Sequence, residues 1–261
     1  MVAQFGESAV VENPALDLLA ELGWTVGNGG AEEFGSAGTL GRDSIADVVL
    51  VHRLRDAIVR LNPGLPALVA QEALDEFVKD RSAMDPVRAN KAVHELLRDG
   101  YRASWRNDDG DDVYETVRFI DFAHADANDW LAASQVRIAG ELHKRRSDTI
   151  LYVNGIPLVL FEFKSPSESV QAAYDKNLCD YRDAIPALFV PNGFVVLSNG
   201  SEAKVGATYA PWEYFGDWKV IDADGNRGKV ALETAIRGTC GQYELLDLIE
   251  NFVAYMERPG G

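Results

Sequence analysis

The sequence predicts an α/β fold in which a mainly helical N-terminal region precedes a buried β-sheet. Up to Gly100, apolar residues recur at the spacing of amphipathic helices. After Asp112 the pattern becomes extended, and two apolar runs, Thr149–Val153 and Ile156–Phe163, flank an Asn-Gly turn. A helical segment and another apolar strand follow this hairpin, an order typical of a sheet that helices cover on both faces.

Four helices are expected in the N-terminal region, and local start or stop signals mark them. Gly23 ends the first helix, whose leucines form a stripe. An Asn-Pro-Gly turn separates the second helix from the third. Asp85 and Pro86 supply the N-cap and first turn of the fourth helix, which Gly100 ends. The expected helices span residues 14–22, 44–61, 66–79 and 85–100.

The rest of the chain is expected to alternate strands with helices. The acidic run Asn107–Asp112 is interpreted as a solvated turn between two strands, because it lacks the ligand order of a calcium-binding loop. Both strands of the Asn-Gly hairpin are apolar on both faces, which places them at the centre of a sheet. Further strands are expected at 117–122, 135–138 and 193–197, and helices at 168–184 and 243–256.

The composition is that of a globular protein, with 261 residues of which 47% are hydrophobic and 25% charged. No apolar stretch approaches the length of a membrane span, and the N-terminus lacks the features of a secretory signal. Cys179 and Cys240 match no zinc or redox spacing, so we expect a reduced, cytoplasmic protein. Three segments are expected: a helical region over 1–110, an α/β core over 111–220 and a connecting segment over 221–261.

The net charge of −16 argues against a nucleic-acid partner, because phosphate binding needs a positive surface. The acidic residues are unevenly distributed, however. Between Arg137 and Arg182, basic and acidic residues nearly balance. The overall charge therefore does not decide the partner, and the local chemistry of this window must.

One constellation in this window can carry chemistry. Asp148 precedes the first strand of the hairpin, while Glu162 and Lys164 lie at the end of the second. Two carboxylates at one sheet end can hold a hard divalent cation, and Lys164 points to the same side of its strand as Glu162. These are the requirements for phosphodiester hydrolysis. The alternative is that these charges only solvate a sheet edge, since the sequence contains two other acid-x-Lys triplets, at 202–204 and 217–219.

The register of the hairpin distinguishes these alternatives. In a strict two-residue turn Val153 pairs with Ile156, which sets Asp148 opposite Phe161 and on the face away from Glu162. A three-residue loop, or an equivalent bulge, shifts the register by one residue. Asp148 and Glu162 then share a face, and we predict this shift.

Several stretches, taken together and in order, are similar to a known family. They are Gln135–Gly140, Lys144–Asp148 and Val153–Lys164, followed by 177–181, 185–189, 198–200 and 203–206. The sequence resembles the PD-(D/E)xK nuclease core, and more narrowly the N-terminal endonuclease domain of the restriction subunit of type I restriction–modification enzymes. Earlier matches at 11–12, 22–24 and 61–63 extend the resemblance over nearly the whole chain. It implies a central mixed sheet flanked by helices.

The resemblance implies that Asp148 and Glu162 bind Mg²⁺ and that Lys164 positions or activates the attacking water. An acid on the first helix completes such sites; Glu12 is the candidate and Glu7 the runner-up, although an acid there also suits the helix dipole. Related nucleases carry Gln-x-x-x-Tyr on the helix after the catalytic strand. This sequence has Asn177 and Tyr181 at those positions, so the amide stands on a shorter stem, and Tyr181 also fits the apolar stripe of its helix.

The resemblance further implies cleavage of double-stranded DNA within a complex that contains methyltransferase and specificity subunits. Lys144, Arg145 and Arg146 precede Asp148 and are candidates for phosphate contacts, although a basic triplet is also typical of a solvated surface. No G-x-x-x-x-G-K-[ST] loop occurs, so ATP is expected to serve only a motor region that lies outside this chain. The alternatives are a non-catalytic DNA-binding or motor-docking module and a related nuclease of DNA repair.

Overall fold

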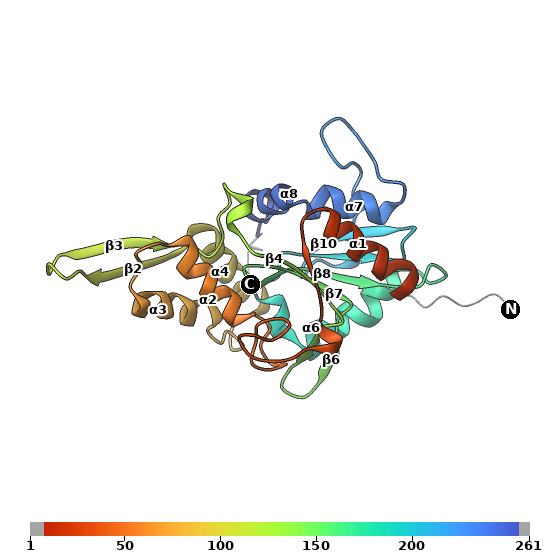
Figure 1. Ribbon diagram of the computed structural model, residues 1–261. Coiled ribbons are helices and arrows are strands. Elements are labelled where there is room, and N and C mark those ends of the chain that lie inside the picture. The colour runs from red at the N-terminus through yellow and green to blue at the C-terminus, as the bar shows by residue number, and fades with distance from the viewer. Residues whose placement is uncertain (1–7, 256–261) are drawn as a thin grey trace, which may run out of the picture.

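A six-stranded mixed sheet forms the centre of the protein in the computed structural model, which describes residues 8–255 (Figure 1). The pairs β1–β4 and β8–β9 are parallel, and the other neighbouring pairs are antiparallel. The fold class predicted from the sequence is therefore confirmed. In spatial order the strands are β1 (Thr25–Asn28), β4 (Trp130–Ser134), β7 (Thr149–Val153), β8 (Ile156–Phe163), β9 (Phe194–Ser198) and β10 (Ala203–Ala207).

Helices and two small hairpins surround this sheet. The helices are α1 (Asn13–Glu21), α2 (Val51–Leu61), α3 (Ala67–Val78), α4 (Pro86–Asp99), α5 (Val170–Ala172), α6 (Cys179–Ala184), α7 (Ala231–Cys240) and α8 (Gln242–Asp247). The hairpins are β2 (Tyr101–Arg106) with β3 (Asp112–Val117), which projects from the body in Figure 1, and β5 (Arg137–Ala139) with β6 (Lys144–Arg146). Within residues 8–255, no helix is long and apolar enough to cross a membrane.

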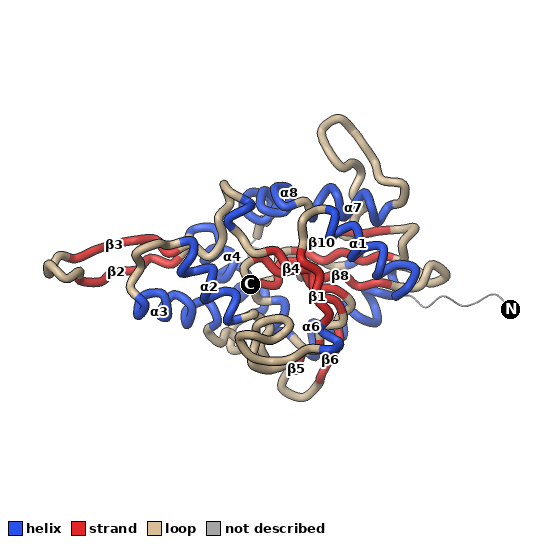
Figure 2. Tube along the Cα trace, in the orientation of Figure 1, coloured by secondary structure: helices blue, strands red, loops and turns tan. Residues whose placement is uncertain are grey.

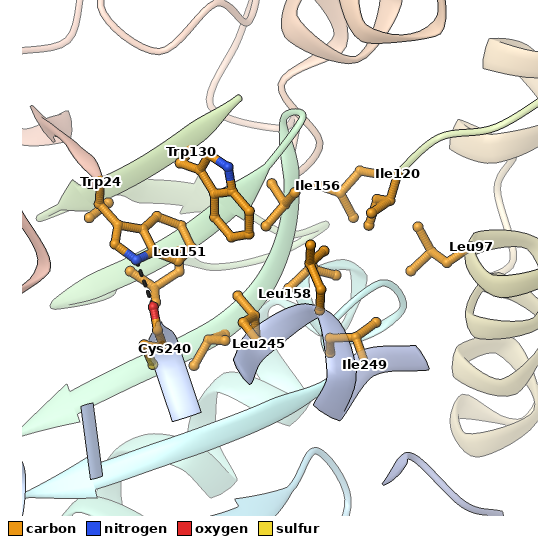
Figure 3. Close-up of a cluster of buried hydrophobic side chains, with 14 of the residues drawn as sticks. Trp24, Leu97, Ile120, Trp130, Leu151, Ile156, Leu158, Cys240, Leu245 and Ile249 are labelled. Carbon is orange, nitrogen blue, oxygen red and sulfur yellow. Dashed lines mark hydrogen bonds between the residues drawn. The ribbon is translucent and has the colours of Figure 1, made fainter. Parts of the chain in front are cut away.

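Each face of the sheet has its own apolar cluster. The first cluster lies under α1, α7 and α8, where the Trp24 indole packs edge-on against Trp130 and donates to the Cys240 carbonyl at 2.8 Å (Figure 3). The second lies under the helical segment from α5 to α6. The first cluster contains residues from all three sequence segments, including Leu19, Leu151 and Leu245. The division at residues 110 and 220 stays a prediction.

A β-bulge sets the register of the β7–β8 hairpin. The turn is the strict two-residue one: Val153 pairs with Ile156, and both Asn154 and Gly155 have positive φ, as an Asn-Gly turn favours. The register then shifts, because Tyr152 pairs with Pro157 but Leu151 pairs with Val159. Proline has no N–H to donate to the ladder and is tolerated at such bulges. The predicted one-residue shift is confirmed, through the bulge and not through a looser turn.

Most predicted helices are present with small changes at their ends. The Asp85 side chain caps α4 by accepting from the Arg88 N–H at 3.0 Å, and Gly100 ends it with φ of +76°. The second helix begins at Val51 and not at residue 44, because Asp47 folds the preceding residues into a turn by accepting from the N–H groups of Asp43 and Ser44. The C-terminal helical segment, α8 with a π-helical turn, ends at Phe252. The predicted end at residue 256 lies outside the described residues.

Two predicted strands are corrected. The segment 117–122 is not a strand beyond Val117; its apolar residues Phe119 and Ile120 are buried from a loop, and the Phe119 carbonyl accepts from Asn154 at 2.9 Å. The strand predicted at 135–138 is replaced by β4, which ends at Ser134, and by the short β5. The left-handed backbone of Gln135, with φ of +54°, separates the two. The turn at 107–112 joins β2 to β3 as predicted.

A buried ion pair attaches the long loop after β1 to the sheet. The side chain of Arg42 has no exposed surface and that of Glu32 is 4% exposed. The Arg42 guanidinium donates to both oxygens of Glu32, at 2.7 and 2.6 Å, and to the carbonyls of Asp47 and Arg137 at 2.9 and 2.7 Å. Because Arg137 opens β5, this pair also fixes the small hairpin that leads to Asp148.

We predict that Arg42→Ala lowers the free energy of unfolding by about 3–5 kcal/mol, because it leaves a buried carboxylate and two carbonyls without their donor. Urea unfolding followed by circular dichroism measures this loss. Arg106→Ala is the matched control, since its ion pair with Asp112 is exposed on the β2–β3 hairpin and we expect stability close to wild type. Equal effects of the two substitutions would contradict the prediction.

Candidate active site

The bulge brings Asp148 and Glu162 to one face of the sheet. Thr149 pairs with Phe161, so Asp148, one residue before β7, lies level with Glu162 near the end of β8. Both side chains are on the side of Ile150 and Leu160, which belong to the second apolar cluster. Asp148 Oδ2 accepts from the backbone N–H of Phe163 at 2.7 Å, which holds its carboxylate against β8.

Lys164 neutralises part of this buried charge. Glu162 is 2% exposed and Lys164 9% exposed, and Lys164 Nζ lies 3.6 Å from Glu162 Oε1. The ammonium group also donates to the carbonyl of Phe163 at 3.1 Å. A buried carboxylate is costly without such partners. Neither of the other acid-x-Lys triplets has this arrangement, since Lys204 and Lys219 both pair with Asp217 at the surface.

The helical segment after β8 presents Asn177 and Tyr181 to the same site. A π-helical turn over Ala173–Leu178 joins α5 to α6, and such turns are frequent at functional sites. Asn177 Nδ2 donates to Glu162 Oε1, so the shorter amide reaches β8. The Tyr181 hydroxyl donates to the Arg146 carbonyl at 2.9 Å. Burial raises the pKa of Tyr181, and the negative charges of Glu162 and Asp148 raise it further.

Glu12 is linked to Asp148 through Gln135, a residue that the sequence analysis did not assign to the site. Glu12 is 3% exposed, and its two carboxylate oxygens accept from Gln135 Nε2 at 2.8 and 2.9 Å. The backbone N–H of Gln135 donates to the carbonyl of Asp148 at 2.6 Å. No local pattern indicates this contact, because it joins residues 123 positions apart. Glu7, the runner-up, lies outside the described residues.

The basic triplet divides into one paired residue and two exposed ones. Arg145 forms a two-pronged ion pair with Asp180 of α6 and thereby lowers the pKa of that carboxyl. Lys144 and Arg146 point to the other side of β6 and are exposed. Arg137 is exposed directly across from Arg146 on β5. Figure 2 shows this small hairpin beside α6, and Asp148 follows two residues after the end of β6.

The donor set fits a hard divalent cation. Asp148 and Glu162 supply carboxylate oxygens side by side, which is the ligand type that Mg²⁺ prefers. Within residues 8–255, no three His, Cys, Asp or Glu side chains gather closely enough to hold a metal ion. Two carboxylates are still compatible with Mg²⁺, because this ion retains several waters and shares its remaining positions with phosphate oxygens.

Comparisons with known proteins agree over most of the chain. Residues 4–214 match the family described as type I restriction enzyme R protein N terminus. The chain is 34% identical, over 94% of its length, to the type I restriction enzyme HindI endonuclease subunit of Haemophilus influenzae. It is 29% identical, over 85% of its length, to the putative type I restriction enzyme MjaIXP endonuclease subunit of Methanocaldococcus jannaschii. It spans only 24% and 21%, respectively, of these two relatives.

We predict that Asn177→Asp lowers the free energy of unfolding by about 2 kcal/mol in metal-free buffer at neutral pH, because it replaces a donor to the Glu162 carboxylate with a like charge. Urea unfolding followed by circular dichroism measures this loss.

Asn251→Asp is the matched control for this substitution. Asn251 also donates its amide to a carboxylate, that of Asp247 at 2.8 Å, but at the surface. Solvent screens the repulsion there, so stability close to wild type is expected. An Asn177→Asp variant as stable as this control would show that Asn177 does not support Glu162.

Proposed function

The chain belongs to the family of type I restriction enzyme R protein N termini, and from this premise we propose that it is a Mg²⁺-dependent endonuclease that cleaves double-stranded DNA. One observation carries the proposal: Asp148 lies level with Glu162, and Lys164 lies on the same side of β8. A carboxylate pair with an adjacent lysine at a sheet end suits hydrolysis of a phosphodiester. A sheet edge that is only solvated has no need to bury Glu162 and Lys164.

We assign the roles from the contacts of each residue. Asp148 and Glu162 would hold the metal ion, which would supply polarisation of a phosphate oxygen and activation of a water. Asn177 and Lys164 both contact Oε1 of Glu162 and orient its carboxylate. Lys164 also places a positive charge where the attacking water and the developing negative charge meet.

We propose that the exposed cations of the β5–β6 hairpin bind the DNA backbone. Arg137, Lys144 and Arg146 share one face of this hairpin, in a chain whose net charge is −16. Arg137 and Arg146 are cross-strand neighbours, and like charges placed directly opposite destabilise a hairpin. A phosphate between them relieves this repulsion. Arg145 points the other way and is already neutralised by Asp180.

The chain spans about a quarter of the length of the relatives it matches, and we propose that it acts as one part of a larger enzyme. We propose that it works in the cytoplasm as part of a restriction–modification complex. Methyltransferase and specificity subunits would supply sequence recognition, and an ATP-driven motor outside these residues would bring DNA to the site. Co-purification with methyltransferase subunits distinguishes this proposal from a related nuclease of DNA repair.

We predict that the wild-type chain binds Mg²⁺ or Mn²⁺ in a calorimetric titration and that Glu162→Ala abolishes this binding, because it removes one of two ligands. A plasmid-nicking assay run alongside tests whether the bound chain cuts. Absence of metal binding, even with DNA present, would overturn the nuclease proposal and leave a non-catalytic DNA-binding or motor-docking module.

The other acid-x-Lys triplets supply matched controls for this experiment. Glu202→Ala is expected to bind metal as the wild type does, because the Glu202 side chain is exposed and precedes β10, which β9 separates from β8. Lys164→Ala is expected to keep metal binding but to lose nicking by about a hundredfold or more, as removal of a charge-stabilising donor does. Lys204→Ala removes a lysine that pairs with Asp217, and we expect its nicking to be unchanged.

We predict that Lys144→Ala combined with Arg146→Ala weakens binding to duplex DNA of any sequence, because both residues contact phosphates. The slope of the logarithm of affinity against the logarithm of salt concentration becomes shallower by about 2, or about 1 per lost contact. Fluorescence anisotropy over a range of salt concentrations measures this slope. Arg145→Ala is the control, because Arg145 pairs with Asp180. An equal change in the slope for this variant would contradict the proposal that Lys144 and Arg146, but not Arg145, contact DNA.

A further inference from the structure

Gln135 ties together three segments at the end of the sheet. Its side-chain amide donates to both carboxylate oxygens of Glu12, at 2.8 and 2.9 Å. Its backbone N–H donates to the carbonyl of Asp148 at 2.6 Å. Glu12 lies directly before α1, Gln135 directly after β4 and Asp148 directly before β7. A single residue therefore joins the N-terminal acid to a residue of the metal-binding pair.

The backbone of Gln135 adopts a conformation that is unfavourable for glutamine. Its φ of +54° lies in the left-handed region, where a Cβ crowds the following carbonyl oxygen. Among the described non-glycine residues only Asn154 shares a positive φ, and asparagine tolerates it in a turn. Such strain persists only where surrounding contacts fix the conformation, and it is frequent at functional sites.

Close packing of the neighbouring backbone constrains the chain on both sides of Gln135. Gly29 presses against the chain on both sides of Gln135: a Cβ at Gly29 would lie 2.9 Å from Val136 Cα and 3.0 Å from the Ser134 carbonyl oxygen. Ser134 also pairs with Thr149 in the sheet. Glycine would suit the left-handed conformation at position 135 better than glutamine does. The contact with Glu12 therefore accounts for a long amide side chain at this position.

We propose that Gln135 is a positioning residue, which holds the Glu12 carboxylate beside Asp148 so that its charge supports cation binding by Asp148 and Glu162. This inference rests on the proposed function. An amide suits the task because it donates hydrogen bonds but carries no charge, so Glu12 keeps its negative charge. A lysine or arginine in its place would cancel that charge. Groups that orient metal-binding residues typically contribute about 10- to 100-fold to metal affinity.

Gln135→Gly separates this role from a structural one. The variant relieves the backbone strain but removes the amide that donates to the buried Glu12 carboxylate. These two effects oppose each other, so its melting temperature without metal is expected to stay close to that of the wild type. Its affinity for Mn²⁺ in a calorimetric titration is expected to fall about tenfold or more, because Glu12 is released. A residue that only shapes the turn would show unchanged metal affinity in this variant.

An exchange of the two side chains tests the contact itself. Glu12→Gln removes the negative charge beside Asp148 and is expected to weaken Mn²⁺ binding. Addition of Gln135→Glu returns one negative charge and restores the hydrogen bond with donor and acceptor exchanged, so most of the lost affinity returns. The single and double variants also test the positioning role of Gln135 if Gln135→Gly proves less stable than the wild type. Failure of the double variant to recover affinity would then overturn the inference.

The outcomes separate this inference from the proposed function. If the wild type binds Mn²⁺ and Gln135→Gly binds it equally tightly, the positioning role is wrong and the nuclease proposal stands. If the wild type binds no Mn²⁺, both fall together. Weakened binding in Gln135→Gly with full thermal stability, together with recovery in the double variant, supports the positioning role.

Discussion

The extra residue in β8 is the constraint on which the site depends. Side chains alternate between the two faces of a strand, so one inserted residue decides whether Asp148 faces Glu162 or points away from it. Pro157 cannot donate to the ladder, and the displaced Leu158 carbonyl accepts instead from Gly193 at 2.8 Å and from the Asn192 side chain at 3.1 Å. The bulge is therefore satisfied from the β9 side and costs the hairpin few hydrogen bonds.

Charge inside this sheet is tolerated because neighbouring elements supply its partners. Glu162 forms an ion pair with Lys164, which directly follows β8, and accepts a hydrogen bond from Asn177 of the helical segment that covers this face. Farther along the same face, the buried carboxylate of Glu32 is neutralised by the buried guanidinium of Arg42. The Arg42–Glu32 pair and the Glu162 site have different roles. The Arg42 pair leaves no carboxylate oxygen for another ligand, and it serves to fasten the loop and β5 in place.

The positions of the basic residues explain how a chain with a large negative charge could bind the proposed DNA substrate. Its net charge of −16 repels a polyanion at long range. Over a few ångströms, however, the field is set by the nearest groups, because salt screens distant charges within about 10 Å. Exposed Arg137 and Arg146 meet on the hairpin that leads to Asp148, while many of the acids, such as Asp222 and Asp224, lie on loops elsewhere. In this view the local basic face, and not the total charge, determines the partner.

The sequence alone determined the α/β class, most helices and the apolar hairpin with its Asn-Gly turn, because periodicity and turn chemistry act over a few residues. It also predicted the register shift, since a shared face for Asp148 and Glu162 required it. Only the tertiary structure decided that 118–122 is a loop, that Arg145 pairs with Asp180, and that Gln135 contacts Glu12. These outcomes arise from packing between segments far apart in the chain, so no local pattern of residues encodes them.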